Sequence, residues 1–167
     1  EGIRWSDGDP FNADDIVFAF ESVLLNPEIR QSPPLWLRSG GEPATLEKID
    51  DYTLVFHFTA SNGLFPLRLA NNAGSDLTPY PHHYLEQFHV DFNPDIDELV
   101  AEAGLESWVD LFKARSEMRN TDFPVLTPWR VIEVGQTIVA ERNPYYWKID
   151  TNFSQLPYID RVVFQPI

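Results

Sequence analysis

The most regular spacing of oxygen-bearing side chains in the sequence resembles that of a calcium-binding loop. The residues read Asp91-x-Asn93-x-Asp95-x6-Glu102, which is the ligand spacing of an EF-hand. However, Ile96 stands where such a loop needs a glycine, and Pro94 lies between two of the supposed ligands. A helix that starts after Asn93 explains the same acids, because carboxylates are favoured in a first helical turn. We therefore predict a helix here and no metal site.

Three histidines close to Asp91 in the sequence have the residue type of a zinc site: His82, His83 and His89. Neighbouring residues on a helix point about 100° apart. His82 and His83 would therefore not converge on one ion. We predict that these histidines belong to a solvated helix start.

Carboxylates and tryptophans are numerous enough to suggest glycoside hydrolysis, which needs two carboxyl groups facing one cleft. With 26 Asp and Glu, chance pairs are expected. The sequence has no nucleophile elbow, no phosphate-binding glycine loop and no His-Glu-x-x-His motif. It has no cysteine either, which excludes thiol catalysis and thiolate metal sites. We predict no catalytic residue, no cofactor and no enzymatic activity; a carbohydrate-active enzyme domain is the alternative from another functional class.

Aromatic side chains at predicted strand ends are better candidates for ligand binding. Trp129 begins a strand after Pro128, and Tyr146 follows the next strand in the run Tyr145-Tyr146-Trp147. Rings at strand ends are well placed to line a cleft, where they bury a large area at low entropic cost. Packing in the core is the alternative for each ring. Asn72 is a third candidate, because it lies in a polar turn after a short predicted helix.

The composition narrows the class of protein. The 167 residues include 26 acidic and 12 basic side chains, which gives a formal net charge of −14. A nucleic-acid binder needs clustered Lys and Arg to neutralise phosphates, so we predict no nucleic-acid partner. No stretch approaches the roughly 20 apolar residues of a membrane-spanning helix. Hydrophobic residues make up 43% of the chain, which suits a packed core and not a disordered acidic tail.

Local patterns predict a mixture of short helices and strands. Asn12 has the residue type of a helix cap, Asp14 and Asp15 occupy the first turn, and Asn26-Pro27 ends the helix after about three turns. Strict alternation over 53–59 predicts one strand of a hairpin over 45–59. The other predicted elements are a helix over 64–71, helices over 94–103 and 106–118, a hairpin over 129–142 and a strand over 161–167. This mixture indicates an α+β fold, a small mixed sheet with flanking helices.

Five blocks of sequence in fixed order extend over nearly the whole chain. They are Gly2-Ile3-Arg4-Trp5-Ser6-Asp7-Gly8 with the helix start that follows, Ile49-Asp50-Asp51-Tyr52-Thr53-Leu54, Pro81-His82-His83-Tyr84, Pro128-Trp129-Arg130-Val131 through Asn143-Pro144-Tyr145-Tyr146-Trp147, and Leu156-Pro157-Tyr158-Ile159-Asp160-Arg161. Together they resemble the extracellular solute-binding proteins of ABC importers, in the oligopeptide/dipeptide-binding family 5.

This resemblance implies a two-lobed protein of the periplasmic-binding-protein type II fold, which closes around its ligand. Residues 1–125 would be the extra subdomain of the first lobe, and 126–167 the return strands of that lobe's main sheet. Both ends of the chain read as strands that are cut, which agrees with a fragment that lacks the second lobe. Only closure of two lobes desolvates a ligand on both sides, so we expect the fragment alone to bind weakly.

The resemblance also implies a function, in which the full protein captures peptides outside the membrane and delivers them to an ABC transporter permease. The implied location is periplasmic or extracellular, and a lipid anchor on the full protein is compatible with it. Where many relatives have a Gly-Thr-Gly-Pro-Tyr-like run, this chain has Leu126-Thr127-Pro128-Trp129. An indole stacks on a sugar as readily as on a peptide side chain, so an oligosaccharide-binding member is the alternative. A plain interaction module with an exposed apolar face is a further alternative.

Overall fold

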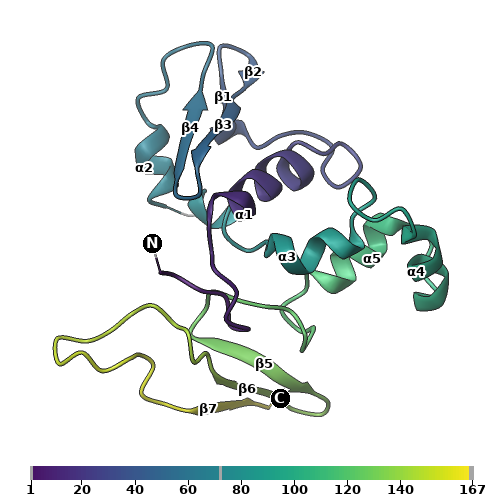
Figure 1. The fold of residues 1–167 in the computed structure, drawn as a ribbon, viewed down its shortest axis with the longest axis vertical. Coiled ribbons are helices and arrows are strands. Elements are labelled where there is room, and N and C mark those ends of the chain that lie inside the picture. Colours follow the sequence, from purple (N-terminus) through teal and green to yellow (C-terminus); the bar gives the residue numbers. More distant parts are fainter. Residues whose placement is uncertain (1, 72, 166–167) are drawn as a thin grey trace. The chain divides into compact units, whose positions relative to one another are not determined.

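The computed structural model describes residues 2–71 and 73–165, and these form two compact units (Figure 1). The first unit comprises Asn12–His82, and the second combines Gly2–Phe11 with the chain from His83 onward. Both contain short helices and antiparallel strands, which confirms the predicted α+β class. Within the described ranges, no helix has the length and apolarity needed to cross a membrane.

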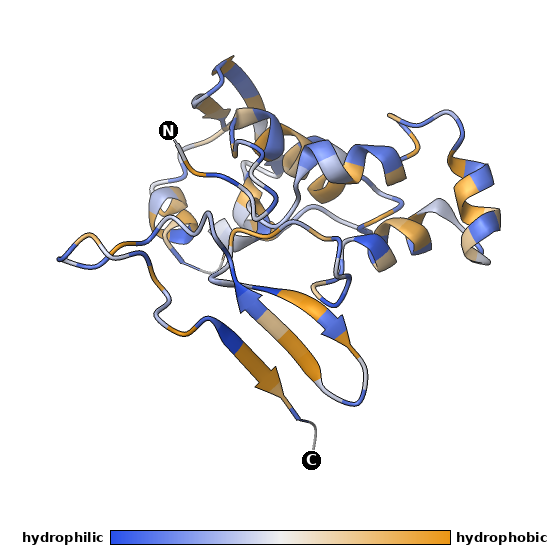
Figure 2. Cartoon of the chain, turned by 60° about the horizontal axis from the view of Figure 1, so that its bottom comes forward, coloured by the Kyte–Doolittle hydropathy of each residue, from blue (hydrophilic) through white to orange (hydrophobic). Residues whose placement is uncertain are grey.

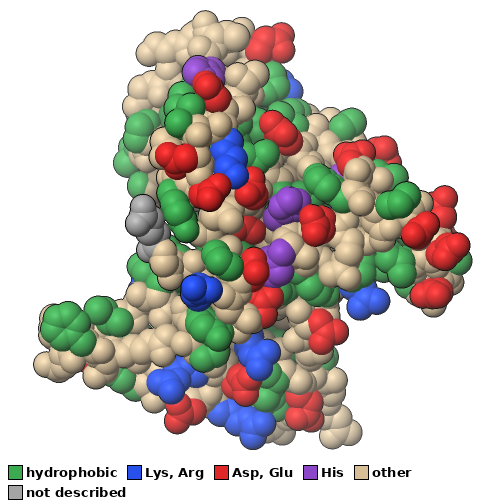
Figure 3. Space-filling model, in the orientation of Figure 1, with side chains coloured by type: hydrophobic (Ala, Val, Ile, Leu, Met, Phe, Trp, Pro, Cys, Tyr) green, Lys and Arg blue, Asp and Glu red, His purple; other side chains and the backbone are tan. Residues whose placement is uncertain are grey.

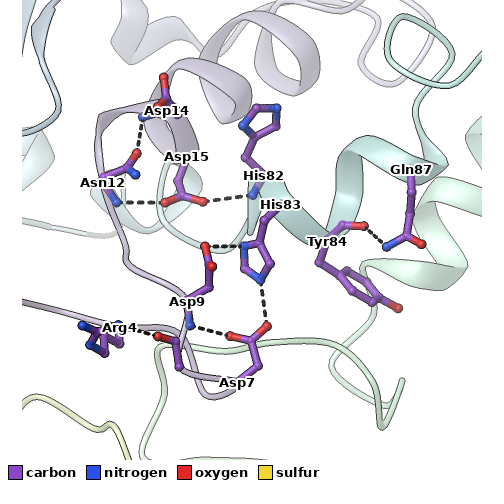
Figure 4. Close-up of polar contacts among 11 residues, drawn as sticks. Arg4, Asp7, Asp9, Asn12, Asp14, Asp15, His82, His83, Tyr84 and Gln87 are labelled. Carbon is purple, nitrogen blue, oxygen red and sulfur yellow. Dashed lines mark hydrogen bonds and ion pairs between the residues drawn. The ribbon is translucent and has the colours of Figure 1, made fainter.

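The first helix of the first unit starts at the predicted cap (Figure 4). Asn12 Oδ1 accepts the N–H of Asp14 at 2.7 Å, and the Asp15 carboxylate accepts the N–H of Asn12 at 2.9 Å. These bonds satisfy donors that a helix start leaves free. The helix comprises α1 (Ala13–Val17) and continues as a π-helical segment, Phe18–Leu24. Its length agrees with the prediction, whereas its π-helical second half was not predicted.

Asp15 also joins the two ends of the first unit. Its second carboxylate oxygen accepts the backbone N–H of His82 at 2.9 Å, although 67 residues separate the two (Figure 4). The imidazole of His82 stacks on Phe18, with ring centroids 4.9 Å apart. Asp15 is 3% exposed. One buried carboxylate therefore serves both as helix cap and as a tertiary contact.

The predicted hairpin covers the core of the first unit. It consists of β3 (Thr45–Asp50) and β4 (Thr53–His57), and Leu54, Phe56 and Phe58 are half-buried while the residues between them are exposed. A short helix, α2 (Phe65–Leu69), packs Phe65 against the same core. The fully buried members of this core are Ala19, Phe20, Leu24, Leu37, Ala44 and Leu77. The small elements around it are η2 (Leu35–Leu37), β1 (Arg38–Ser39), β2 (Glu42–Pro43) and η3 (Gly74–Asp76).

The second unit contains a group of short helices. They are α3 (His82–Leu85), whose first residue belongs to the first unit, η4 (Glu86–Phe88), α4 (Ile96–Ala103) and α5 (Trp108–Arg115). The helix predicted directly after Asn93 begins slightly later, because Asn93 Oδ1 accepts the N–H of Asp95 and forms a turn first. Gly104 ends α4 with a positive φ of 66°, as a helix C-terminus commonly requires.

The prediction of a solvated histidine cluster is wrong for His89. Its side chain is fully buried and lies edge-on to the rings of Trp108 and Phe112, at centroid distances of 4.7 and 5.7 Å. The N–H of Asp91 donates to His89 Nδ1 at 3.2 Å. An aromatic environment therefore surrounds His89, and no sequence periodicity predicts it because the rings come from another helix, α5.

The N-terminal turn of the second unit is fixed by polar contacts. Gly8 has φ +97°, and its N–H donates to the carbonyl of Trp5 at 2.9 Å, as the Asp-Gly sequence predicts. His83 Nε2 lies 2.7 Å from a carboxylate oxygen of Asp7, and its Nδ1 lies 3.4 Å from one of Asp9 (Figure 4). His83 therefore connects α3 to the turn through its hydrogen bond with Asp7, and Asp9 lies beside the same ring.

The second unit also contains a three-stranded antiparallel sheet in the order β5-β6-β7. The strands are β5 (Trp129–Val134), β6 (Ile138–Arg142) and β7 (Arg161–Phe164), which confirms the predicted hairpin and final strand. Trp129 is paired with Arg142, and Glu141 with Arg161. Figure 2 shows hydrophobic residues along all three strands.

Substitution of Asp15 by alanine tests the double role of this carboxylate. The change removes the acceptor of two backbone N–H groups, one of them at His82, so we expect a loss of about 2–3 kcal/mol in the free energy of unfolding. Glu21→Ala is the control, since Glu21 is an exposed acid of the same helical run. Urea denaturation followed by circular dichroism measures both. Equal stability of the two variants would contradict the assignment.

Candidate ligand-binding site

Trp129 lies at the first position of β5, as its place after Pro128 predicts. Its indole N–H donates to the carbonyl of Ile159 at 3.3 Å, which ties the ring to the segment that enters β7. The side chain is half-buried. Trp129 therefore presents part of its ring to solvent from a fixed position at the end of the sheet.

Asn143 fixes the backbone on both sides of the β5–β6 hairpin, a role that the sequence analysis did not predict. Its side-chain amide donates to the carbonyls of Val125 and Thr127 at 3.2 and 3.1 Å. Its Oδ1 accepts the N–H of Tyr145 at 2.9 Å, and its own N–H donates to Pro128 at 2.8 Å. All of these bonds form in a fully buried position. The Asn-Pro sequence was the available signal, because an asparagine before a proline favours a turn.

Tyr146 follows Asn143 in the turn after β6. Its N–H donates to the carbonyl of Asn143 at 3.2 Å, and its carbonyl accepts the side-chain amide of Gln155 at 2.8 Å. The ring is half-buried and lies 5.9 Å from that of Trp147. Trp129 and Tyr146 are thus both anchored through Asn143. In the described part of the chain, no ring contact joins them directly.

The loop from Lys148 to Tyr158 is ordered around one carboxylate. Asp150 Oδ1 accepts the N–H groups of Asn152 and Ser154 at 2.7 and 2.8 Å, and Oδ2 accepts the hydroxyl of Tyr158 at 2.6 Å. The Tyr158 hydroxyl, followed by the backbone donors, lowers the pKa of Asp150 below its ordinary value, and the same bond raises the pKa of Tyr158. These bonds fix the backbone of an otherwise exposed loop.

The tip of this loop carries an exposed aromatic side chain. Phe153 has a positive φ of 64° and is 83% exposed. Such a backbone conformation is uncommon for a bulky residue. Figure 3 shows hydrophobic side chains exposed at the end of the loop that joins β6 to β7 in Figure 1. The hydrogen bonds to Asp150 thus fix a loop on which Phe153 and Tyr158 are exposed to solvent.

The third predicted residue, Asn72, lies outside the described residues. The residue before it, Asn71, lines an open pocket in the first unit together with Leu64, Leu67, Arg68 and Ala73. The pocket follows one face of α2 and the turn after it. Sequence reasoning did not predict this pocket. The sequence feature that could have predicted the pocket is the helical spacing of Leu64, Leu67 and Asn71, which places the three residues on one face.

Among the described residues no group of side chains has the arrangement of a metal site, and two open pockets lack the carboxylate pair of a glycosidase. Across residues 2–71 and 73–165, no three His, Asp or Glu side chains are grouped as metal ligands. The described lining of the α2 pocket includes no carboxylate, and an open pocket of the second unit includes one, Glu117. A glycosidase needs a facing pair of carboxyl groups, which neither pocket supplies.

Comparison with known proteins identifies the family. Bacterial extracellular solute-binding proteins, family 5 Middle, match residues 1–167, so the chain belongs to this family. It is 32% identical over 168 residues to the periplasmic alpha-galactoside-binding protein of Rhizobium meliloti (strain 1021). The matched region covers 99% of this chain and 22% of that protein. The resemblance inferred from the sequence blocks is thereby confirmed.

Two solved structures share the fold. One is an oligopeptide-binding protein OppA, with 39% identity and a TM-score of 0.88 over 99% of this chain and 26% of that chain. The other is the periplasmic binding protein MelB of Agrobacterium fabrum C58 in complex with stachyose, with 31% identity and a TM-score of 0.69 over 99% of this chain and 23% of that chain. The chain therefore spans about a quarter of the length of these relatives.

Substitution of Asn143 by aspartate tests its positioning role. The carboxylate would keep the acceptor but face the carbonyls of Val125 and Thr127 without a donor, so we expect a loss of at least about 2 kcal/mol in the free energy of unfolding. Asn152→Asp is the matched control, because Asn152 is exposed. Urea denaturation at neutral pH measures both. A loss no larger than that of the control would show that Asn143 does not fix this region.

Removal of the Tyr158 hydroxyl tests the organisation of the loop. In Tyr158→Phe the main cause of the lowered pKa is lost, so the pKa of Asp150 should rise toward its ordinary value of 3.8. Because the folded pKa lies below 3.8, the stabilising contribution of Asp150 is present above that pH and is lost as pH falls through the lowered pKa. NMR titration of the carboxyl group measures the change.

Tyr52→Phe is the control for this titration. The pKa of Asp50 is lowered mainly by the backbone N–H of Tyr52, which the substitution retains. The pKa of Asp50 should therefore stay unchanged in that variant. A pKa of Asp150 that also stays unchanged in Tyr158→Phe would refute the assigned role of the hydroxyl.

Proposed function

We propose that the protein containing this chain binds a peptide outside the cytoplasmic membrane and delivers it to an ABC transporter permease. The observation that carries the proposal is the match to oligopeptide-binding OppA, at 39% identity and a TM-score of 0.88 over 99% of this chain. Membership of the solute-binding family supports it. The proposed location is the periplasm or the cell exterior, with or without a lipid anchor, since the alpha-galactoside-binding relative is named periplasmic.

An oligosaccharide is the second candidate ligand. The relative from Rhizobium meliloti is an alpha-galactoside-binding protein, and MelB was solved with stachyose. Trp129 favours this candidate, because a partly exposed indole provides a flat face for a sugar ring. A peptide remains the first candidate because the OppA match has both the higher identity and the higher TM-score.

Trp129 and Tyr146 are proposed to contact the ligand. Both rings are half-buried at the same end of the β5–β6 hairpin, and backbone bonds through Asn143 hold them in place. Rigid, partly exposed aromatics are typical of ligand sites, because they lose little entropy on binding. Asn72 is proposed as a further contact on the ground that Asn71 lines the pocket beside α2.

The division into subdomains at residue 125 also remains a proposal. In it, 126–167 supplies return strands to a larger sheet of the first lobe. The exposure of apolar residues on β7, at Val163 and Phe164, supports this proposal. In the described residues β7 is paired on one side alone, and edge strands of this kind are commonly covered in a complete protein. Coverage by the rest of a two-lobed protein explains the exposed face without a separate interaction partner.

Calorimetric titration of the full-length protein tests the function and the site together. The probes are tri-leucine and stachyose, which represent the two ligand classes. We expect Trp129→Ala to weaken binding of the preferred probe by about tenfold or more, because a truncated aromatic anchor loses its contact area. Tyr52→Ala is the control, since Tyr52 is an exposed ring at the turn of the β3–β4 hairpin. Equal effects of the two substitutions would remove Trp129 from the site, and binding of neither probe would argue against the function.

A further inference from the structure

Helix α2 has apolar residues on two faces. Phe65 and Leu69 pack against the core of the first unit, and the ring of Phe65 lies 4.9 Å from that of Phe56. On the other face, Leu64 and Leu67 are 57% and 67% exposed. A helix that is apolar all round is normally covered on both sides. Something is therefore expected to cover the outer face of α2.

The outer face combines these leucines with a cation. Arg68 and Asn71 lie with Leu64 and Leu67 around the open pocket. Of the residues that the structure describes, none forms an ion pair with Arg68, whereas Lys48 of the same unit binds Asp14 and Asp51. The described lining includes no acid. In a chain with a net charge of −14, this pocket combines an apolar surface with a positive charge that no described residue pairs.

We propose that the α2 pocket binds the C-terminal residue of a peptide ligand. Leu64 and Leu67 contact its apolar side chain, the guanidinium of Arg68 binds its terminal carboxylate, and Asn71 faces the preceding peptide group. A planar guanidinium matches a carboxylate with two parallel hydrogen bonds. This inference rests on the proposed solute-binding function and names the ligand class for one part of the site.

The chemistry of the pocket fits a peptide better than a sugar. Sugars are neutral and bind through ring stacking and hydroxyl groups, which call for aromatic faces and neutral polar partners. The described lining has no aromatic side chain, because Phe65 is turned into the core. A carboxylate would form stronger hydrogen bonds with Arg68 than a sugar hydroxyl would, because hydrogen bonds between two charged groups are roughly twice as strong as neutral ones.

The test compares a peptide acid with its amide on the full-length protein. The probes are tri-leucine, tri-leucine C-terminal amide and stachyose, and the variants are Arg68→Gln, Leu67→Asn and the control Arg119→Gln, which removes a charge from an exposed position in the second unit. Isothermal titration gives the affinities, and thermal melting of each ligand-free variant reports its folding. Leu67→Asn leaves the cation in place, so it tests the apolar contact separately.

The expected result is that the wild type binds the acid about tenfold more tightly than the amide, which corresponds to one charge-assisted interaction. Arg68→Gln should abolish this preference, Arg119→Gln should retain it, and Leu67→Asn should weaken acid and amide alike. A loss of melting temperature in Arg68→Gln with an unchanged preference would show that another part of the protein covers α2, and would overturn the inference.

The other outcomes separate the inference from the function on which it rests. Binding of tri-leucine with equal affinity for acid and amide overturns the α2 assignment and leaves solute binding intact. Binding of stachyose alone also overturns the assignment, and makes the oligosaccharide candidate the function. Binding of no probe overturns the assignment and the proposed function together.

Discussion

The fully buried side chain of Asn143 is the contact on which the geometry of the sheet end depends. Its side-chain N–H groups donate to two carbonyls of the segment that enters β5. Its side-chain oxygen, Oδ1, accepts the N–H of Tyr145 in the turn after β6. Buried polar groups of this kind are costly to leave unpaired. These bonds fix the start of β5 relative to the turn after β6. Trp129 lies at the start of β5 and Tyr146 lies in that turn, so the bonds also fix the backbone of both residues.

A buried polar side chain has a similar role in the first unit. Asp15 accepts a bond from the helix start and another from His82, so one carboxylate fixes both ends of that unit. In each unit buried polar side chains fix which backbone segments meet: Asp15 in the first unit, and Asn143 together with Ser6 in the second.

Several parts of the fold could be predicted because their determinants are local. The cap at Asn12 and the alternation in β4 each depend on a few neighbouring residues, and both predictions are confirmed. His89 could not be predicted, because the rings of Trp108 and Phe112 that bury it belong to a different helix. The pocket beside α2 was missed for a related reason: exposure of Leu64 and Leu67 depends on which face of α2 meets the core.

The sequence by itself determined the family, the α+β class and the aromatic candidates at the strand ends, since motif order, hydrophobic period and turn residues are all readable along the chain. The tertiary structure alone decided which polar side chains are buried, which loop carbonyls Asn143 satisfies and which face of α2 stays open. Those features depend on contacts between residues far apart in sequence, and such contacts form only when the backbone has folded.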